Sequence, residues 1–63
     1  MKLNEKLKEL RQNRNLTQTA VAEYLGISAQ TVSKWERGLL SPDILLLPKL
    51  AVLCRCSIDS IFE

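Results

Sequence analysis

The sequence predicts an all-α fold in which five short helices pack into one compact domain. Five segments of the chain show the apolar spacing of a helix face, and none is interpreted as a strand. Glycine, asparagine and Ser-Pro signals separate these segments by short turns. A chain of 63 residues is near the size at which a single hydrophobic core is only just sufficient. We therefore expect one domain over residues 1–63.

A first amphipathic helix is expected over about residues 4–14. Leu3, Leu7 and Leu10 recur at positions i, i+4 and i+7, with lysine and glutamate between them. Asn4 is the candidate N-cap. Asn13 or Asn15 is expected to take the left-handed conformation that ends the helix.

Two short helical segments with a tight turn between them occupy the centre of the chain, over about residues 17–37. Thr17 offers a hydroxyl cap to the first of them. Gly26 follows where a chain that leaves a helix turns left-handed, and Ser28 is placed to cap a second helix over about 29–37. The outward face of that second helix carries amide and cationic side chains. Two helices joined in this way have the geometry that fits a helix into the major groove of DNA.

A proline interrupts the next helical segment, which spans residues 44–54. Proline is harmless only in the first turn of a helix. Either a single turn precedes the helix, or a helix capped at Asp43 bends at Pro48. We expect an irregular first turn that is continuous with the helix. A last short helix is expected over residues 58–62, with Ser57 as its cap.

The net charge of +2 does not by itself indicate a nucleic-acid partner. The distribution of charge is more informative. Basic residues concentrate in the first segment and on the outward face of the second central helix, and three acidic residues, Asp43, Asp59 and Glu63, lie towards the C-terminus. This asymmetry predicts one positive face.

The composition argues against an enzyme, a metal protein and a membrane protein. The sequence has no histidine, no nucleophile with a paired base and no glycine loop for phosphates, so we expect no catalytic residue, no cofactor and no metal. Cys54 and Cys56 are too close for an ordinary disulfide within one regular element and lack further zinc ligands, so reduced thiols are expected. Without a signal peptide or an apolar run of membrane length, the cytoplasm is the expected location.

These motifs resemble one known family, the Cro-like or xenobiotic-response-element type of phage-repressor helix-turn-helix regulators. In the central pair of helices the matching residues are Ala22, Gly26, Val32 and Trp35-Glu36-Arg37-Gly38. Outside it the similar segments are Lys8-Glu9-Leu10-Arg11, Ser41-Pro42-Asp43-Ile44, Leu47-Pro48-Lys49-Leu50-Ala51 and Ser57-Ile58-Asp59. The resemblance covers nearly the whole chain. It implies sequence-specific binding of double-stranded DNA by a bacterial or phage transcription regulator.

The resemblance also implies which residues meet the DNA. Base contacts are expected from Ala29, Gln30 and Lys34. Glutamine can pair with adenine and lysine with guanine in the major groove, whereas Ala29 departs from the long polar side chains of the family and offers only an apolar contact to a thymine methyl group. The expected phosphate contacts come from Gln18, Ser28, Thr31 and Arg37. An ion pair between Arg11 and Glu36 is implied as the tie between the first helix and the groove-facing helix.

Two classes of function remain open at this point. The first is a DNA-binding regulator that acts as a homodimer on two half-sites one helical turn apart, with room for a further C-terminal domain or a protein partner. The second is a protein-interaction module, such as an antitoxin or an adaptor, that uses the leucine-rich surface over residues 39–47. The same fold serves both roles, so the fold alone does not decide between them.

Overall fold

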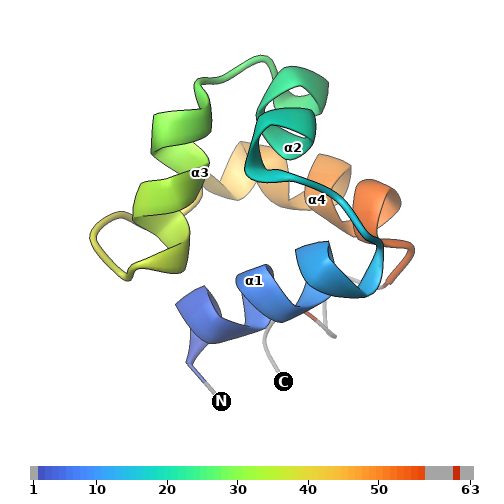
Figure 1. Cartoon of the computed structure of the whole chain (residues 1–63), viewed down its shortest axis with the longest axis horizontal. Coiled ribbons are helices and arrows are strands. Elements are labelled where there is room, and N and C mark those ends of the chain that lie inside the picture. Colours follow the sequence, from blue (N-terminus) through green and yellow to red (C-terminus); the bar gives the residue numbers. More distant parts are fainter. Residues whose placement is uncertain (1, 57–60, 62–63) are drawn as a thin grey trace.

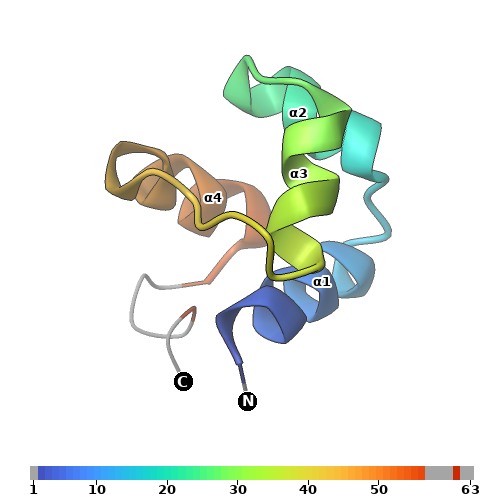
Figure 2. The ribbon, with the colours of Figure 1, turned by 90° about the vertical axis from the view of Figure 1, so that its left-hand side faces the viewer.

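The structure is a computed structural model that describes residues 2–56 and Ile61. In this part of the chain all regular elements are helical, as predicted. They are α1 (Leu3–Asn13), α2 (Gln18–Leu25), α3 (Ala29–Glu36), the 3₁₀ turn η1 (Ile44–Leu46) and α4 (Leu47–Cys54). α2 packs against α3, α1 packs against the other end of α3, and α4 runs behind them (Figure 1). Figure 2 shows the same arrangement from the side, with α3 between α1 and α2.

α1 begins at Leu3, so the prediction that Asn4 caps this helix is wrong. The side chain of Asn4 is used elsewhere, because its Nδ2 donates to the main-chain oxygen of Glu36 at 3.2 Å. At the other end of α1, Asn13 or Asn15 was expected to be left-handed, and the structure shows that it is Asn15. Asn15 has a φ of 56°, the left-handed conformation expected of an asparagine just after the helix.

The turn between α2 and α3 forms as the sequence predicts. Thr17 Oγ1 accepts from the main-chain N–H of Ala20 at 3.0 Å, and Ser28 Oγ accepts from that of Thr31 at 3.2 Å. Gly26 lies between the two helices at a φ of 73°, which glycine adopts without steric cost. α3 ends at Glu36, one residue earlier than expected, with Arg37 in the C-cap position.

The segment around Pro48 adopts the first of the two alternatives, a separate turn followed by a helix. Asp43 Oδ1 accepts from the main-chain N–H of Leu45 at 2.9 Å and so caps the turn η1. α4 starts directly after η1, with Pro48 in its first turn. The missing N–H of the proline therefore costs no hydrogen bond. α4 ends at Cys54, and Arg55 follows in the C-cap position with a φ of 53°.

The expected count of five helices is wrong for the part of the chain that the structure describes, which contains four α-helices. The fifth helix was expected over residues 58–62, and of these only Ile61 is among the described residues. Ile61 itself is helical and 1% exposed. Ser57, the expected cap, also lies outside the described residues.

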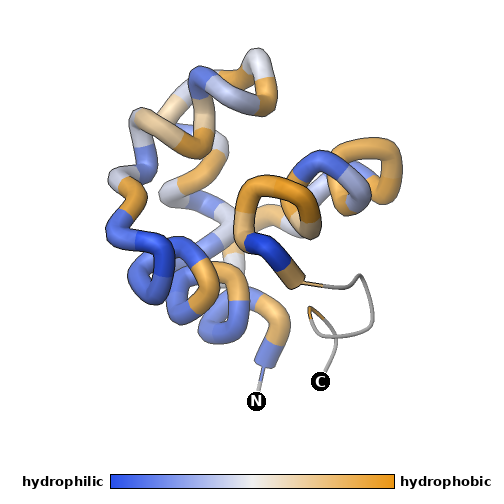
Figure 3. Tube along the Cα trace, turned by 90° about the vertical axis from the view of Figure 1, so that its right-hand side faces the viewer, coloured by the Kyte–Doolittle hydropathy of each residue, from blue (hydrophilic) through white to orange (hydrophobic). Residues whose placement is uncertain are grey.

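The hydrophobic core collects residues from all four α-helices. α1 contributes one buried side chain, α2 three, α3 two and α4 four, and Ile61 is also buried. The buried core residues are Leu7, Val21, Ala22, Leu25, Val32, Trp35, Leu47, Leu50, Ala51, Cys54 and Ile61. The tube in Figure 3 is hydrophobic along most of η1 and α4, part of which stays exposed. Among the described residues no helix is long and apolar enough to cross a membrane.

Candidate nucleic-acid interface

One face of α3 packs into the core, and the opposite face is exposed. Val32 and Trp35 are 2% and 3% exposed and pack into the core. Gln30 and Lys34, four residues apart and therefore on one face of the helix, are exposed. Ala29 is half-buried and packs against the core, so of the three expected base-contacting residues it has the least surface to offer.

The N-terminus of α2 presents free hydrogen-bond donors. Thr17 satisfies the main-chain N–H of Ala20. Within residues 2–56 and 61, no acceptor faces the main-chain N–H groups of Gln18 and Thr19. The first N–H groups of a helix point along its axis, and together with the helix dipole they favour an anion at this end.

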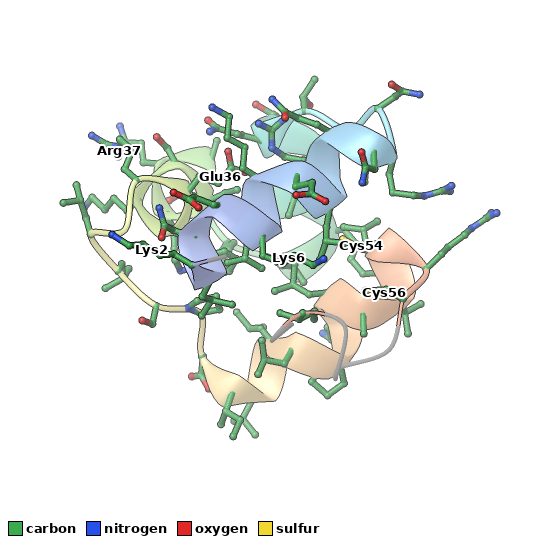
Figure 4. All side chains as sticks on the ribbon, turned by 90° about the horizontal axis from the view of Figure 1, so that it is seen from below. Lys2, Lys6, Glu36, Arg37, Cys54 and Cys56 are labelled. Carbon is green, nitrogen blue, oxygen red and sulfur yellow. The ribbon has the colours of Figure 1, made fainter. Side chains whose placement is uncertain are left out.

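The expected phosphate-contacting residues on α3 lie at both of its ends. Ser28 and Thr31 are joined through their hydroxyl oxygens, which are 2.9 Å apart, in the cap at the start of α3. Arg37 follows the last residue of α3, and its Nε donates to the main-chain oxygen of Ser33 at 3.4 Å. The rest of the Arg37 side chain projects away from the helices at the rim of the molecule (Figure 4).

Arg11 and Glu36 form an ion pair that joins α1 to α3. Arg11 Nε donates to Glu36 Oε2 at 2.6 Å and Nη2 donates to Oε1 at 3.0 Å. The third nitrogen, Nη1, donates to the main-chain oxygen of Leu16 at 2.8 Å. The two side chains are only 15% and 5% exposed, so water screens the pair weakly.

Gln18 belongs to the same network, a contact that the sequence did not indicate. Its Nε2 donates to Glu36 Oε1 at 3.1 Å. One carboxylate therefore receives hydrogen bonds from α1 and from the first residue of α2. The main-chain oxygen of the same glutamate accepts from Asn4, which is the second contact that sequence reasoning missed. Neither contact follows from sequence spacing, because the residues are 18 and 32 positions apart.

Two further groups with possible chemistry are buried. The indole N–H of Trp35 is buried and has no hydrogen-bond partner among the described residues, so it is not an accessible donor to phosphate. Cys54 is buried and Cys56 half-buried, and both are free thiols. Burial raises the pKa of the Cys54 thiol, the neighbouring Cys56 raises it further, and Arg14 lowers it.

Comparison with known proteins connects this geometry to a family. A family model described as helix-turn-helix matches residues 7–61. The HTH-type transcriptional activator BcrR of Enterococcus faecalis is 39% identical over 63 residues, all of this chain and 31% of that protein. The HTH-type transcriptional regulator MJ0272 of Methanocaldococcus jannaschii is 38% identical over 60 residues, 95% of this chain and 91% of that protein.

A prophage protein shows the same likeness. The SPbeta prophage-derived HTH-type transcriptional regulator YonR of Bacillus subtilis is 34% identical over 59 residues, 94% of this chain and 55% of that protein. The chain thus spans a third of BcrR and about half of YonR, but nearly the whole of MJ0272. The family match covers most of the chain, and the α2–turn–α3 unit lies inside it. The chain belongs to the Cro/C1-type helix-turn-helix family of transcriptional regulators.

Proposed function

We propose that this chain is a sequence-specific double-stranded DNA-binding domain that inserts α3 into the major groove. One observation supports this most directly. Gln30 and Lys34 are exposed on one face of α3, whereas Val32 and Trp35 hold its opposite face in the core. A rigid helix with an amide and an ammonium group on its free face offers the groups that read adenine and guanine edges.

The proposed base contacts divide between three residues. Gln30 pairs with an adenine through its amide, and Lys34 donates to guanine O6 and N7 one helical turn further along α3. Ala29 is half-buried and contributes only an apolar contact to a thymine methyl group. The sequence preference of the domain therefore depends chiefly on Gln30 and Lys34.

The proposed phosphate contacts surround these residues. The free main-chain N–H groups of Gln18 and Thr19 bind a phosphate at the N-terminus of α2. The hydroxyl groups of Ser28 and Thr31 and the guanidinium of Arg37 bind phosphates at the two ends of α3. These groups fix the position of the domain on the duplex and carry no sequence information.

We further propose that the chain binds as a homodimer on a two-fold site, because one short helix reads too few base pairs for useful affinity. Apolar side chains suitable for a contact between copies follow α3. Leu39, Leu40, Ile44 and Leu45 are 66%, 50%, 75% and 79% exposed. BcrR and YonR extend well beyond the matched region, so the proposal includes a further domain joined to this one. It also includes a cytoplasmic location.

The same exposed side chains favour a second candidate function. A protein-interaction module such as an antitoxin or an adaptor would use the surface over residues 39–47 to bind another protein. Salt separates the two candidates. DNA binding through phosphates weakens steeply as ionic strength rises, whereas an apolar contact responds little.

The test is selection of duplexes from a randomised pool, followed by fluorescence anisotropy of the selected duplex at several salt concentrations. We expect a recurring sequence with two-fold symmetry, half-sites one helical turn apart and an affinity that falls with salt. Binding that shows no preference for any duplex over random DNA at low salt would refute the proposal. A protein ligand bound through residues 39–47 under the same conditions would favour the second candidate.

A further inference from the structure

One side of α1 contacts the C-terminal end of α3. Asn4 Nδ2 donates to the main-chain oxygen of Glu36, and Arg11 donates to both carboxylate oxygens of the same residue. Asn4 and Arg11 are about two helical turns apart, so they lie on one side of α1. The last residue of α3 is therefore bound by two turns of α1 at once.

Lys8 lies between these two residues on the same side of α1. It is four positions after Asn4 and three before Arg11, the spacings at which side chains on a helix are neighbours, with Cβ atoms about 5–6 Å apart. Leu7, the residue before it, is buried in the core, whereas Lys8 is exposed. Lys8 thus lies at the outer rim of the contact between α1 and α3.

The N-terminus of α2 adjoins this rim. Gln18, the first residue of α2, donates from Nε2 to Glu36 Oε1, so α2 meets α1 and α3 at one carboxylate. The free main-chain N–H groups proposed above to bind a phosphate belong to Gln18 and to Thr19 beside it. A phosphate bound there would lie close to the Arg11 end of the rim.

The end of α3 lies at the other end of the rim. Side chains on an α-helix point back towards its N-terminus, so Lys8 leans over the turn that holds Asn4. Asn4 contacts the end of α3, which Arg37 directly follows. Figure 4 shows Glu36 and Arg37 along one edge of α1 and Lys6 at the opposite edge. Lys8 therefore lies between two groups proposed to bind phosphates, the N-terminus of α2 and Arg37.

The positive charge of Lys8 is not compensated within the described residues. The ion pair found there joins Arg11 to Glu36, so the carboxylate of Glu36 is already neutralised. Glu5 and Glu9 are the other acidic residues of α1, and within residues 2–56 and 61 neither forms an ion pair with Lys8. An uncompensated ammonium group beside free N–H donors attracts an anion.

We propose that Lys8 binds a DNA phosphate, so that α1 is a third helix in contact with the duplex. The proposal rests on the DNA-binding function proposed above and adds α1 to its surface. Phosphate contacts fix the register and orientation of a protein on DNA. A contact from Lys8 therefore links the orientation of α3 in the groove to the bonds that Asn4 and Arg11 make with Glu36.

The experiment compares the full chain with Lys8→Gln and with Lys6→Gln, which remove the same charge from two different sides of α1. Residues two positions apart on a helix do not share a face, so Lys6→Gln is the matched control. Glutamine forms helices about as well as lysine, and circular dichroism should show both variants to be folded. Each protein is titrated by fluorescence anisotropy onto the selected duplex and onto random duplex DNA over a range of salt.

We expect Lys8→Gln to lower the affinity for both duplexes about 2- to 5-fold, as for an exposed ion pair. The slope of log affinity against log salt concentration should fall in magnitude by about 0.9, the value for one phosphate contact. Lys6→Gln should leave this slope unchanged. An unchanged slope in Lys8→Gln would overturn the proposal. Equal losses in the two variants would also overturn it, because affinity would then follow the net charge of the chain.

Uncharged phosphate analogues locate the contact. Each phosphate of the selected site is replaced, one at a time, by methylphosphonate, which removes its charge. At one position the replacement should weaken binding of the wild-type chain and of Lys6→Gln but have little effect on Lys8→Gln. If no position distinguishes Lys8→Gln from the wild-type chain, Lys8 makes no direct phosphate contact.

The outcomes separate this inference from the proposed function. A wild-type chain that binds no duplex would remove both. A wild-type chain that selects a sequence, with the same salt slope in Lys8→Gln, would remove the inference alone. A wild-type chain that binds random DNA as tightly as any selected duplex would remove sequence-specific binding, and the salt slopes of the two variants on random DNA would still decide whether Lys8 binds a phosphate.

Discussion

Arg11 and Glu36 meet side by side, with two guanidinium nitrogens on two carboxylate oxygens at 2.6 and 3.0 Å. Such a bidentate contact fixes direction as well as distance. Because Arg11 lies in α1 and Glu36 is the last residue of α3, the pair sets the orientation of α3 relative to α1. Gln18 adds the first residue of α2 to the same contact.

Removing one partner of this pair should destabilise the domain strongly. Glu36→Leu leaves the guanidinium of Arg11 without its counter-charge, and Arg11→Met leaves the carboxylate stranded, so each should lower the free energy of unfolding by about 3–5 kcal/mol. Urea denaturation measures this loss. The double variant should lose clearly less than the sum of the two, because neither charge then remains buried. Strictly additive losses would show that the two side chains do not interact.

The left-handed Arg55 offers a matched pair of substitutions. Arg55→Gly should raise the free energy of unfolding by about 0.5–1 kcal/mol, since glycine relieves the left-handed strain at φ 53° but adds freedom to the unfolded chain. Gly26→Ala should lower it by about 1 kcal/mol. No atom lies within 4 Å of a Cβ at Gly26, so this loss has a conformational origin rather than a clash. Thermal denaturation of both variants checks the two opposite signs.

The two proposed kinds of DNA contact should respond differently to alanine. Gln30→Ala should cost about 1–3 kcal/mol on the selected duplex and little on random DNA, because it removes a base contact. Arg37→Ala should lower the affinity for both duplexes alike. It should also reduce the slope of log affinity against log salt concentration by the amount expected for about one lost phosphate contact. Anisotropy titrations over a range of salt separate these outcomes. A salt slope unchanged in Arg37→Ala would remove Arg37 from the phosphate set.

The exposed leucines after α3 can be tested without disturbing the core. Leu45→Ser changes a side chain that is 79% exposed, so the free energy of unfolding should change by less than about 0.5 kcal/mol. If this surface joins two copies, the variant should bind a two-fold site with reduced cooperativity while its affinity for a single half-site is unchanged. Val52→Ser is the control, because Val52 is also exposed but lies in α4. Equal effects of the two variants would contradict a specific contact through Leu45.

Alkaline pH should weaken the fold through Cys54. Burial raises the pKa of this thiol above its ordinary value of 9.0 in the folded chain, so the folded state holds the proton more tightly than the unfolded state. The resulting stability is present in full below the unfolded pKa and is lost as pH rises through the folded pKa. Urea denaturation between pH 7 and about 10.5 should show a steeper decline for the wild-type chain than for Cys54→Ala. Parallel curves would show that Cys54 does not titrate differently in the two states.

The local signals in the sequence predicted the local structure well. Thr17, Gly26 and Ser28 act through residues three or four positions away, so their roles can be read from spacing alone. Asn4 was wrongly predicted as a cap because a residue 32 positions away accepts its hydrogen bond. The bond from Gln18 to Glu36 was missed for the same kind of reason, since it depends on how three helices meet. The exposed face of α3 was predictable because the periodicity of its buried residues fixes it.

The shortness of α3 has a consequence for how the domain unfolds. Eight residues are too few for a stable helix in isolation. Ser28 holds one end of α3 and the contacts from Asn4 and Arg11 hold the other, so its backbone amides should exchange with deuterium only when the whole domain opens. The exposed face of α3 should therefore be as stable as the fold itself, without a partly unfolded form of its own. Any substitution that lowers global stability therefore multiplies the unfolded fraction of α3 by the same factor as the unfolded fraction of the whole domain.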